Sequence, residues 1–159
     1  MAPDTSAHAF ENLRLDNQLC FALYAATHAI TRAYRSLLTD LGITYPQYLV
    51  LIVLWENDKI PVGEIAKRLQ LDAAALTPLV KRLENLGLIA RIRDSRDERV
   101  VRICLSEQGK ALESRAAQVQ SEVGCKTGLD AKQFYELRNQ LHGLVSALGQ
   151  AEESVSIAA

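Results

Sequence analysis

The hydrophobic period of this chain changes once, and that change limits the folds available to it. Between residues 62 and 86, apolar side chains recur every three or four positions in two segments separated by a turn at 70–72, which predicts two short helices. At 88–93 and 99–105 the pattern becomes that of two strands joined by a charged tip, which predicts a β-hairpin. Helix, turn, helix and hairpin in this order predict a winged helix-turn-helix.

Capping residues place the helix ends in this part of the chain. Asp72 precedes the second short helix, where an N-cap carboxylate is favourable, and Gly87 follows it as a C-terminal stop. Upstream, Thr44 and Gln47 have the spacing of a capping box. They predict the start of another helix, which runs to an extended piece at 59–61.

Long apolar stripes at helical spacing lie toward both ends of the chain. The first predicts a helix that begins after Asp16, with this residue or the following asparagine as its cap, and ends at Gly42. The others predict a long helix from Ser106 to a break in the loop 124–128, and a last helix that begins with a capping box at 130–133. Terminal helices with apolar faces and no other partner predict a dimer interface.

We therefore expect a mostly α-helical fold with a small β-hairpin wing. Residues 1–45 with 106–159 form the predicted helical dimerisation region, and residues 46–105 form the DNA-binding region of the same continuous domain. A chain of 159 residues, 48% of them apolar, can bury a core of its own. Without an apolar run long enough to span a membrane or the features of a signal peptide, a cytoplasmic protein is expected.

The net charge of −1 hides an uneven distribution. Eleven lysines and arginines and seven acidic residues lie between Lys59 and Lys110, a balance of +4, whereas the rest of the chain carries −5. The predicted helix-turn-helix and hairpin thus hold the basic charge that a nucleic-acid-binding surface needs.

The second helix of such a pair enters the major groove of DNA with its first residues. Small side chains there let the backbone approach base edges, and basic residues further along reach phosphates or a guanine. The residues of this helix predicted to face DNA are Ala73, Ala75, Thr77, Pro78, Lys81 and Arg82. Pro78 forfeits a helical hydrogen bond, as expected at a position kept for function or packing. Taken alone, these residues also fit a helix with a solvated basic face.

Arginines crowd the predicted hairpin, and acidic residues lie among them. Successive side chains of a strand alternate between its faces, so Arg91 and Arg93 share one face. Asp94 and Asp97 can hold arginines by charge-assisted bonds. A protruding tip of this kind suits contact with phosphates and the minor groove. The arginines predicted to contact DNA are Arg91, Arg93, Arg96 and Arg99.

The segments that resemble the MarR family of winged-helix regulators are 71–84, 87–89 and 94–99. The last holds the most specific motif, Asp-x-Arg-Asp-x-Arg, and the similarity covers nearly the whole chain. The resemblance implies an obligate homodimer on a palindromic operator, usually as a repressor, with Arg91, Asp97 and Arg99 meeting or orienting toward the DNA. Relatives often have Ser, Thr or Gly where this chain has Ala73 to Ala75, so hydroxyl-to-phosphate contacts are not carried over.

Cys20 is the residue that bears most on what the protein senses. It falls in the first turn of the first predicted helix, where helix N–H groups favour a thiolate able to attack a peroxide. Tyr24 lies one turn further on, and Tyr34 lies fourteen residues on, about 21 Å along a helix. If Tyr34 and Tyr45 serve Cys20, they therefore come from a partner subunit. Taken alone, Cys20 also fits a small buried hydrophobic residue.

The spacing of Cys20, Tyr34 and Tyr45 resembles the OhrR branch of the MarR family, which senses organic hydroperoxides. The resemblance implies that two tyrosines of one subunit bond to Cys20 of the other, with Tyr24 nearby. Cys125 matches the resolving cysteine of the two-cysteine subclass. Hydroperoxide then oxidises Cys20, an intersubunit disulfide forms with Cys125, and the operator is released.

Three alternatives stay open at this point. A MarR-type repressor released by phenolic ligands would leave the cysteines incidental, and a structural DNA-binding protein would have no switch. A thiol peroxidase would use Cys20 catalytically, but the chain lacks the strand and helix alternation typical of such enzymes, so no enzyme is expected. Cys104 is expected to lie outside the redox cycle. Without Cys-x-x-Cys spacing or clustered histidines, neither a metal nor a cofactor is expected.

Overall fold

The computed structural model describes residues 10–94, 97 and 99–157. The chain divides into two compact units, which meet between Val123 and Gly124. Within the described ranges, no helix is long and apolar enough to cross a membrane. The proposed division into a dimerisation region and a DNA-binding region stays a prediction.

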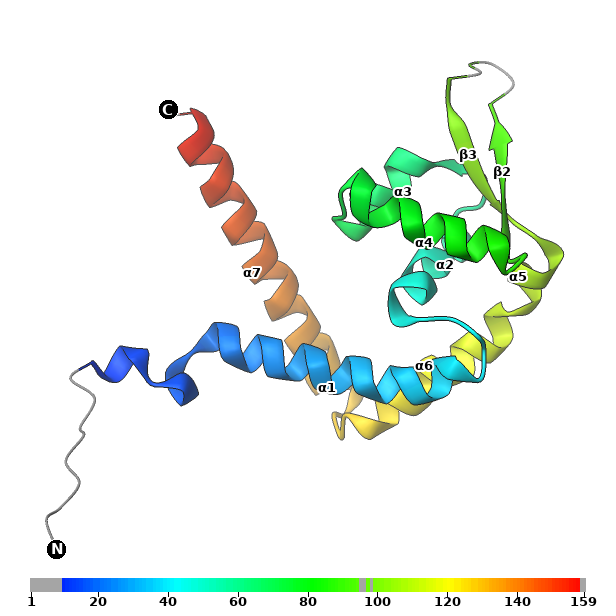
Figure 1. Cartoon of the computed structure of the whole chain (residues 1–159). Coiled ribbons are helices and arrows are strands. Elements are labelled where there is room, and N and C mark those ends of the chain that lie inside the picture. Colours follow the sequence, from blue (N-terminus) through cyan, green and yellow to red (C-terminus); the bar gives the residue numbers. More distant parts are fainter. Residues whose placement is uncertain (1–9, 95–96, 98, 158–159) are drawn as a thin grey trace, which may run out of the picture. The chain divides into compact units, whose positions relative to one another are not determined.

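The first unit is a winged helix-turn-helix, which confirms the predicted fold class (Figure 1). Two 3₁₀ turns precede its first α-helix. The elements in chain order are α1 (Leu19–Thr39), α2 (Tyr45–Glu56), β1 (Ile60–Pro61), α3 (Val62–Leu69), α4 (Ala73–Asn85), β2 (Ile89–Arg93), β3 (Val101–Leu105), α5 (Glu107–Ala111) and α6 (Glu113–Lys126). The second unit holds the end of α6 and the helix α7 (Ala131–Ile157).

The α3–turn–α4 pair forms as predicted. Gln70 ends α3 in the left-handed conformation, with φ at 53°, and Asp72 caps α4 by accepting from the Ala75 backbone N–H at 2.7 Å. On the inner side of the pair, Ile65 and Leu76 are fully buried. These caps and buried residues fix the direction of α4, which carries the predicted DNA-facing residues.

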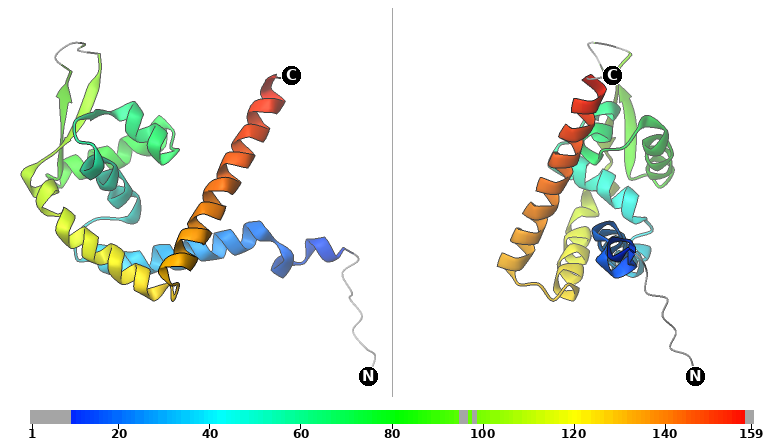
Figure 2. Two further views of the ribbon diagram at one scale, coloured as in Figure 1. Left: turned by 180° about the vertical axis from the view of Figure 1, so that it is seen from behind. Right: turned by 90° about the vertical axis from the view of Figure 1, so that its left-hand side faces the viewer.

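The hairpin of β2 and β3 extends beyond α3 and α4 (Figures 1 and 2). The strands are antiparallel, with Ile89 opposite Leu105 at the base. The piece expected to be extended, 59–61, supplies a third strand, because β1 pairs with β3 and places Ile60 opposite Ile103. The wing is thus anchored by its base to a small sheet whose inner residues join the core.

The helix α2 lies at the centre of the first unit. Its apolar residues do not form a single stripe but surround the helix, and Val50, Leu51 and Leu54 are fully buried. The predicted capping box at its start is confirmed, with the Thr44 backbone N–H donating to Gln47 Oε1 at 2.7 Å. This fixed start positions the tyrosines of α2.

The first helix begins later than predicted. Asp16 and Asn17 lie in a preceding 3₁₀ turn, where the Asn17 amide donates to the Glu11 carbonyl at 2.9 Å instead of capping a helix. α1 therefore begins at Leu19, and Cys20 is its second residue, in the first turn as predicted.

The helix predicted from Ser106 is continuous only to Ala111. Ser106 caps α5, accepting from the Gly109 N–H at 3.0 Å, but Leu112 separates α5 from α6. In a continuous helix the Gly109 carbonyl accepts from the N–H four residues on. Here it accepts the indole N–H of Trp55 at 3.0 Å, which accounts for the break.

Cys125 does not lie in a loop, and this corrects the predicted break at 124–128. α6 continues through Gly124 and Cys125, and the chain turns at Gly128, where φ is +69°. The capping box that follows is confirmed, since the Gln133 N–H donates to the Asp130 carboxylate at 2.8 Å. Cys125 is therefore held in the last turn of a helix.

Candidate functional site

The first turns of α4 present small and basic side chains. All of the residues predicted to face DNA are exposed: Ala73, Ala75, Thr77, Pro78, Lys81 and Arg82. The Thr77 hydroxyl donates to the Ala73 carbonyl at 2.6 Å and is used within the helix. This end of α4 therefore offers methyl groups and backbone to a groove, with Lys81 and Arg82 positioned further along.

Ion pairs fix two arginines of the wing strands, Arg91 and Arg102. Arg102 pairs with Asp94 and also donates to the Lys59 carbonyl at 3.0 Å, which joins the two edges of the sheet. Arg91 Nε lies 3.1 Å from Glu84 Oε2, and this pair ties β2 to α4. The helix and the wing predicted to touch DNA are thus connected by a side-chain contact of their own.

Closer to the tip of the wing, Asp97 orients Arg99. Its carboxylate accepts from the Arg99 backbone N–H at 3.0 Å and from Nε at 3.3 Å, while the Arg99 side chain stays 94% exposed. Arg93 is exposed on the same face of β2 as Arg91. Arg96 lies outside the described residues. Among the described residues of the first unit, α4 and the wing thus both carry exposed basic side chains of the kind that contact phosphates.

Tyr34 and Tyr45 come together although they lie on different helices. Their ring centroids are 4.9 Å apart. Tyr48 completes this tyrosine cluster, at 5.5 Å from Tyr34 and 6.2 Å from Tyr45. Tyr48 begins the apolar run of α2 and was not predicted as a site residue. Its position three residues after Tyr45, on the same helix face, is the signal that could have identified it.

Partial or full burial raises the pKa of each phenol in the tyrosine cluster. Burial raises the pKa of Tyr34 to about 12, and the nearby Tyr48 and Tyr45 add to the rise. Burial also raises the pKa of Tyr45 and the pKa of Tyr48. A phenol that keeps its proton is a hydrogen-bond donor, so the cluster can stabilise an anion placed against it.

Within one chain, Cys20 lies far from the tyrosine cluster. Cys20 is exposed, and the continuous α1 places it about 21 Å of helix from Tyr34. Tyr24, one turn after Cys20, is exposed and packs on His28 with ring centroids 4.3 Å apart. Cys125 is exposed and belongs to the second unit.

The third cysteine is held in the sheet. Cys104 lies in β3 and is half-buried, and its thiol donates to the Ala90 carbonyl of β2 at 3.4 Å. This position confirms that Cys104 is a strand residue, and its place outside the redox cycle stays a prediction.

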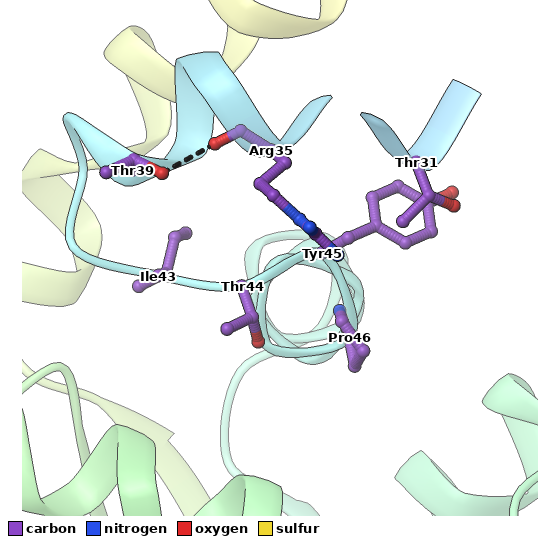
Figure 3. Close-up of a pocket in the computed structure, with 7 residues that line it drawn as sticks. All are labelled: Thr31, Arg35, Thr39, Ile43, Thr44, Tyr45 and Pro46. Carbon is purple, nitrogen blue, oxygen red and sulfur yellow. Dashed lines mark hydrogen bonds between the residues drawn. The ribbon is translucent and has the colours of Figure 1, made fainter. Parts of the chain in front are cut away.

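A pocket of about 280 Å³ opens where α1 meets the start of α2 (Figure 3). Its lining residues are Thr31, Arg35, Thr39, Ile43, Thr44, Tyr45 and Pro46. Arg35 extends from α1 toward the start of α2, and the Tyr45 ring reaches toward Thr31 (Figure 3). The pocket therefore gives a small organic molecule access to one phenol of the tyrosine cluster.

Comparisons with known proteins point to DNA-binding regulators. The family of SarA/Rot transcriptional regulators matches residues 32–115. The chain is 50% identical over 135 residues to the HTH-type transcriptional regulator TtmR of Methylorubrum extorquens, covering 80% of this chain and 69% of that protein. It is 42% identical over 141 residues to the organic hydroperoxide resistance transcriptional regulator of Bacillus subtilis, covering 89% of this chain and 96% of that protein.

Solved structures agree with these relatives. Reduced AbfR bound to DNA matches with a TM-score of 0.76 and 32% identity, over 89% of this chain and 96% of that one. Disulfide-formed AbfR matches with a TM-score of 0.62 and 35% identity, over 85% of this chain and 95% of that one. These proteins are transcriptional regulators and not enzymes.

Proposed function

The chain belongs to the MarR/SarA-type winged-helix family of transcriptional regulators, and on that basis we propose that it is a repressor that senses organic hydroperoxides through Cys20. The observation that carries the proposal is the pairing of Tyr34 and Tyr45, two neutral phenols with rings 4.9 Å apart. The Bacillus subtilis relative is named for organic hydroperoxide resistance, and AbfR has both a reduced DNA-bound form and a disulfide form.

The proposed sensor is a homodimer. Within one chain, about 21 Å of helix separates Cys20 from Tyr34, so the phenols reach a sulfur only from another subunit. Large apolar side chains on the terminal helices are exposed in the single chain and support such an interface: Leu19, Phe21 and Ile30 on α1, and Phe134, Leu137, Leu141, Val145 and Leu148 on α7.

The proposed chemistry is a two-electron oxidation. The Cys20 thiolate attacks the O–O bond of the hydroperoxide; the sulfur gains an oxygen as a sulfenic acid, and the alkoxide leaves and takes a proton to become an alcohol. The Cys125 thiol of the partner subunit then attacks that sulfur, and a disulfide forms with loss of water. Two reducing thiols from the cell restore both cysteines. Tyr34 and Tyr45 support the first step by donating to the thiolate.

The proposed DNA contact uses α4 in the major groove and the wing beside it. The exposed Ala73, Ala75, Thr77 and Pro78 approach base edges, while Lys81, Arg82, Arg91, Arg93 and Arg99 contact phosphates or the minor groove, with Asp97 orienting Arg99. Arg96 has the same proposed role. A disulfide tolerates Cα separations of only about 7 Å, so forming one moves the helices and changes the distance between the two recognition helices. Such a regulator acts in the cytoplasm on a palindromic operator.

The test is the covalent state of the protein after oxidation. Reduced protein is treated with one equivalent of cumene hydroperoxide and run on a non-reducing gel beside Cys20→Ser, Cys125→Ser and, as a matched control, Cys104→Ser. We expect a covalent dimer in wild type and in the Cys104 variant, and none in the other two. Wild type that stays monomeric would rule out the Cys20–Cys125 bridge.

The pocket beside Tyr45 supports one other candidate function, release of DNA by an anionic phenolic ligand. Arg35 lines this pocket, and its guanidinium suits a carboxylate such as that of salicylate. Operator binding is therefore measured in a mobility-shift assay for wild type and for the Cys20→Ser variant. Release by hydroperoxide that requires Cys20 supports the redox switch, whereas release of both proteins by salicylate, with no effect of hydroperoxide, supports the ligand-responsive repressor.

A further inference from the structure

Arg102 lies in β3, the central strand of the sheet, and its guanidinium binds acceptors beside both outer strands. Nη1 donates to the carbonyl of Lys59, just before β1, at 3.0 Å. Nε pairs with the carboxylate of Asp94, just after β2. The Asp94 side chain is only 11% exposed, so water screens this ion pair less than it screens a pair on the open surface. One side chain thus holds the ends of β1 and β2 together across β3.

The acceptor at Lys59 is itself held in place. Lys59 has the left-handed backbone conformation, with φ at 59°, which a lysine rarely adopts. Its N–H donates to the Asp58 carboxylate at 2.8 Å, and the same oxygen accepts from the Leu105 N–H of β3 at 2.8 Å. Such a conformation persists only where the surrounding contacts determine it. Arg102 therefore binds a carbonyl that is fixed to the base of the wing, three residues before α3 begins.

The acceptor at Asp94 is connected to Arg99 by consecutive hydrogen bonds. The Asp94 N–H donates to the Val100 carbonyl at 2.9 Å, and the Val100 N–H donates to the Asp97 carbonyl at 2.9 Å. The Asp97 carboxylate in turn accepts from the Arg99 N–H at 3.0 Å. A shift of Asp94 relative to β3 therefore moves the segment that carries the exposed Arg99 side chain.

We propose that Arg102 is a positioning residue for DNA binding: by holding Asp94 and the Lys59 carbonyl in one geometry, its guanidinium sets the direction in which the wing presents Arg99. This inference rests on the proposed contact between the wing and DNA. A guanidinium suits the role because its donors form a rigid planar fork, which the single ammonium group of a lysine does not provide. Arg102 uses Nε and Nη1 inside the sheet and acts on DNA through the wing, without a phosphate contact of its own.

The test separates the charge of Arg102 from its shape. Affinity is measured by fluorescence anisotropy on a labelled duplex that the wild-type protein selects from a random-sequence library. Arg102→Lys keeps the charge and loses the fork, whereas Arg102→Met loses both. We expect each variant to bind about fivefold to fiftyfold more weakly than wild type. Arg115→Lys is the matched control, since it removes a guanidinium bond from α6 to the Asp40 carbonyl, and it should bind like wild type.

Two further comparisons distinguish positioning from a stabilising role. In an Arg99→Ala background, Arg102→Met should cost a smaller factor in affinity, because its effect passes through Arg99. Asp94→Asn removes a negative charge, which by itself favours binding to a polyanion. Because this change also weakens the pair with Arg102, we expect weaker binding. It is the milder change and tests the proposal even where an Arg102 variant does not fold, which urea midpoints show.

Wild-type affinity in a folded Arg102→Lys variant would show that only charge is needed and would overturn the inference. A lower urea midpoint with unchanged affinity, an equal loss with and without the Arg99 side chain, or unchanged or tighter binding by Asp94→Asn would overturn it as well. Wild type that selects no duplex, or Arg99→Ala with wild-type affinity, would instead overturn the proposed wing contact, and this inference with it.

Discussion

The raised pKa of Tyr34 makes the stability of the fold fall at alkaline pH. The folded state holds the pKa of Tyr34 at about 12, whereas a tyrosine in the unfolded chain titrates near 10. The stability that comes from keeping the phenol neutral is therefore fully present below about pH 10 and is lost as pH rises toward about 12. We expect the urea midpoint to fall across this interval, in parallel with the rise of tyrosinate absorbance. Tyr34→Phe should flatten the fall, and a wild-type midpoint that is constant to pH 12 would contradict the assignment.

Arg99 is the exposed wing residue with the clearest DNA prediction. Its guanidinium is free of the core and oriented by Asp97. We expect Arg99→Ala to weaken binding to operator and to unrelated DNA by similar factors, and to lower the slope of log affinity against log salt by about one per subunit. Fluorescence anisotropy at several salt concentrations measures this. Arg138→Ala on α7 is the charge-matched control, and an unchanged slope for Arg99→Ala would exclude a phosphate contact.

Single residues differ in how far the sequence could predict them. Their spacing and a family resemblance predict a shared role for Cys20, Tyr34 and Tyr45, and helix length alone indicates that Tyr34 cannot touch Cys20 of its own chain. Tyr48 was missed because it begins a run of apolar residues, which predicts core packing. Its place beside Tyr34 follows only from the packing of α1 against α2.

At the scale of elements, α5 packs against the base of the wing through Gly109. A Cβ atom at this position would lie 2.0 Å from the Leu88 carbonyl oxygen, just before β2. We expect Gly109→Ala to lower the free energy of unfolding by about 1–3 kcal/mol or more, because backbone has to move. Gly63→Ala in α3, where the added atom meets open space, is the matched control. Equal urea midpoints for the two variants would show that the contact is not tight.

Element boundaries were predictable where they are encoded locally. Asp72, Thr44 and the 130–133 capping box each act over three residues, and the structure confirms all three. The break between α5 and α6 could not be predicted, because its cause, Trp55, lies 54 residues from Gly109 in the sequence. The pairing of β1 with β3 could not be predicted for the same reason, since it joins residues some forty positions apart.

At the scale of the whole molecule, the exposed apolar side chains of α7 predict an obligate dimer. Leu148 is 60% exposed, and Leu141 lies two turns before it on the same face. We expect Leu141→Glu to raise the dimer dissociation constant at least about a hundredfold, since an unpaired carboxylate in an interface costs several kcal/mol. Sedimentation equilibrium measures it, with Asn139→Glu on the opposite face of the helix as control. A variant that stays dimeric would place the interface elsewhere.

The ion pair between Arg91 and Glu84 joins the wing to α4, so in the proposed complex each subunit presents both elements to DNA together. Two such subunits in the proposed dimer measure length along the double helix as well as sequence. A single base substitution removes one protein–base contact and lowers the affinity only in part. An inserted base pair between the two halves of the palindrome turns one half by about 35° relative to the other, so that it no longer lines up with its recognition helix. An operator can therefore accumulate single base substitutions and still bind the proposed dimer, whereas a change in half-site spacing prevents binding.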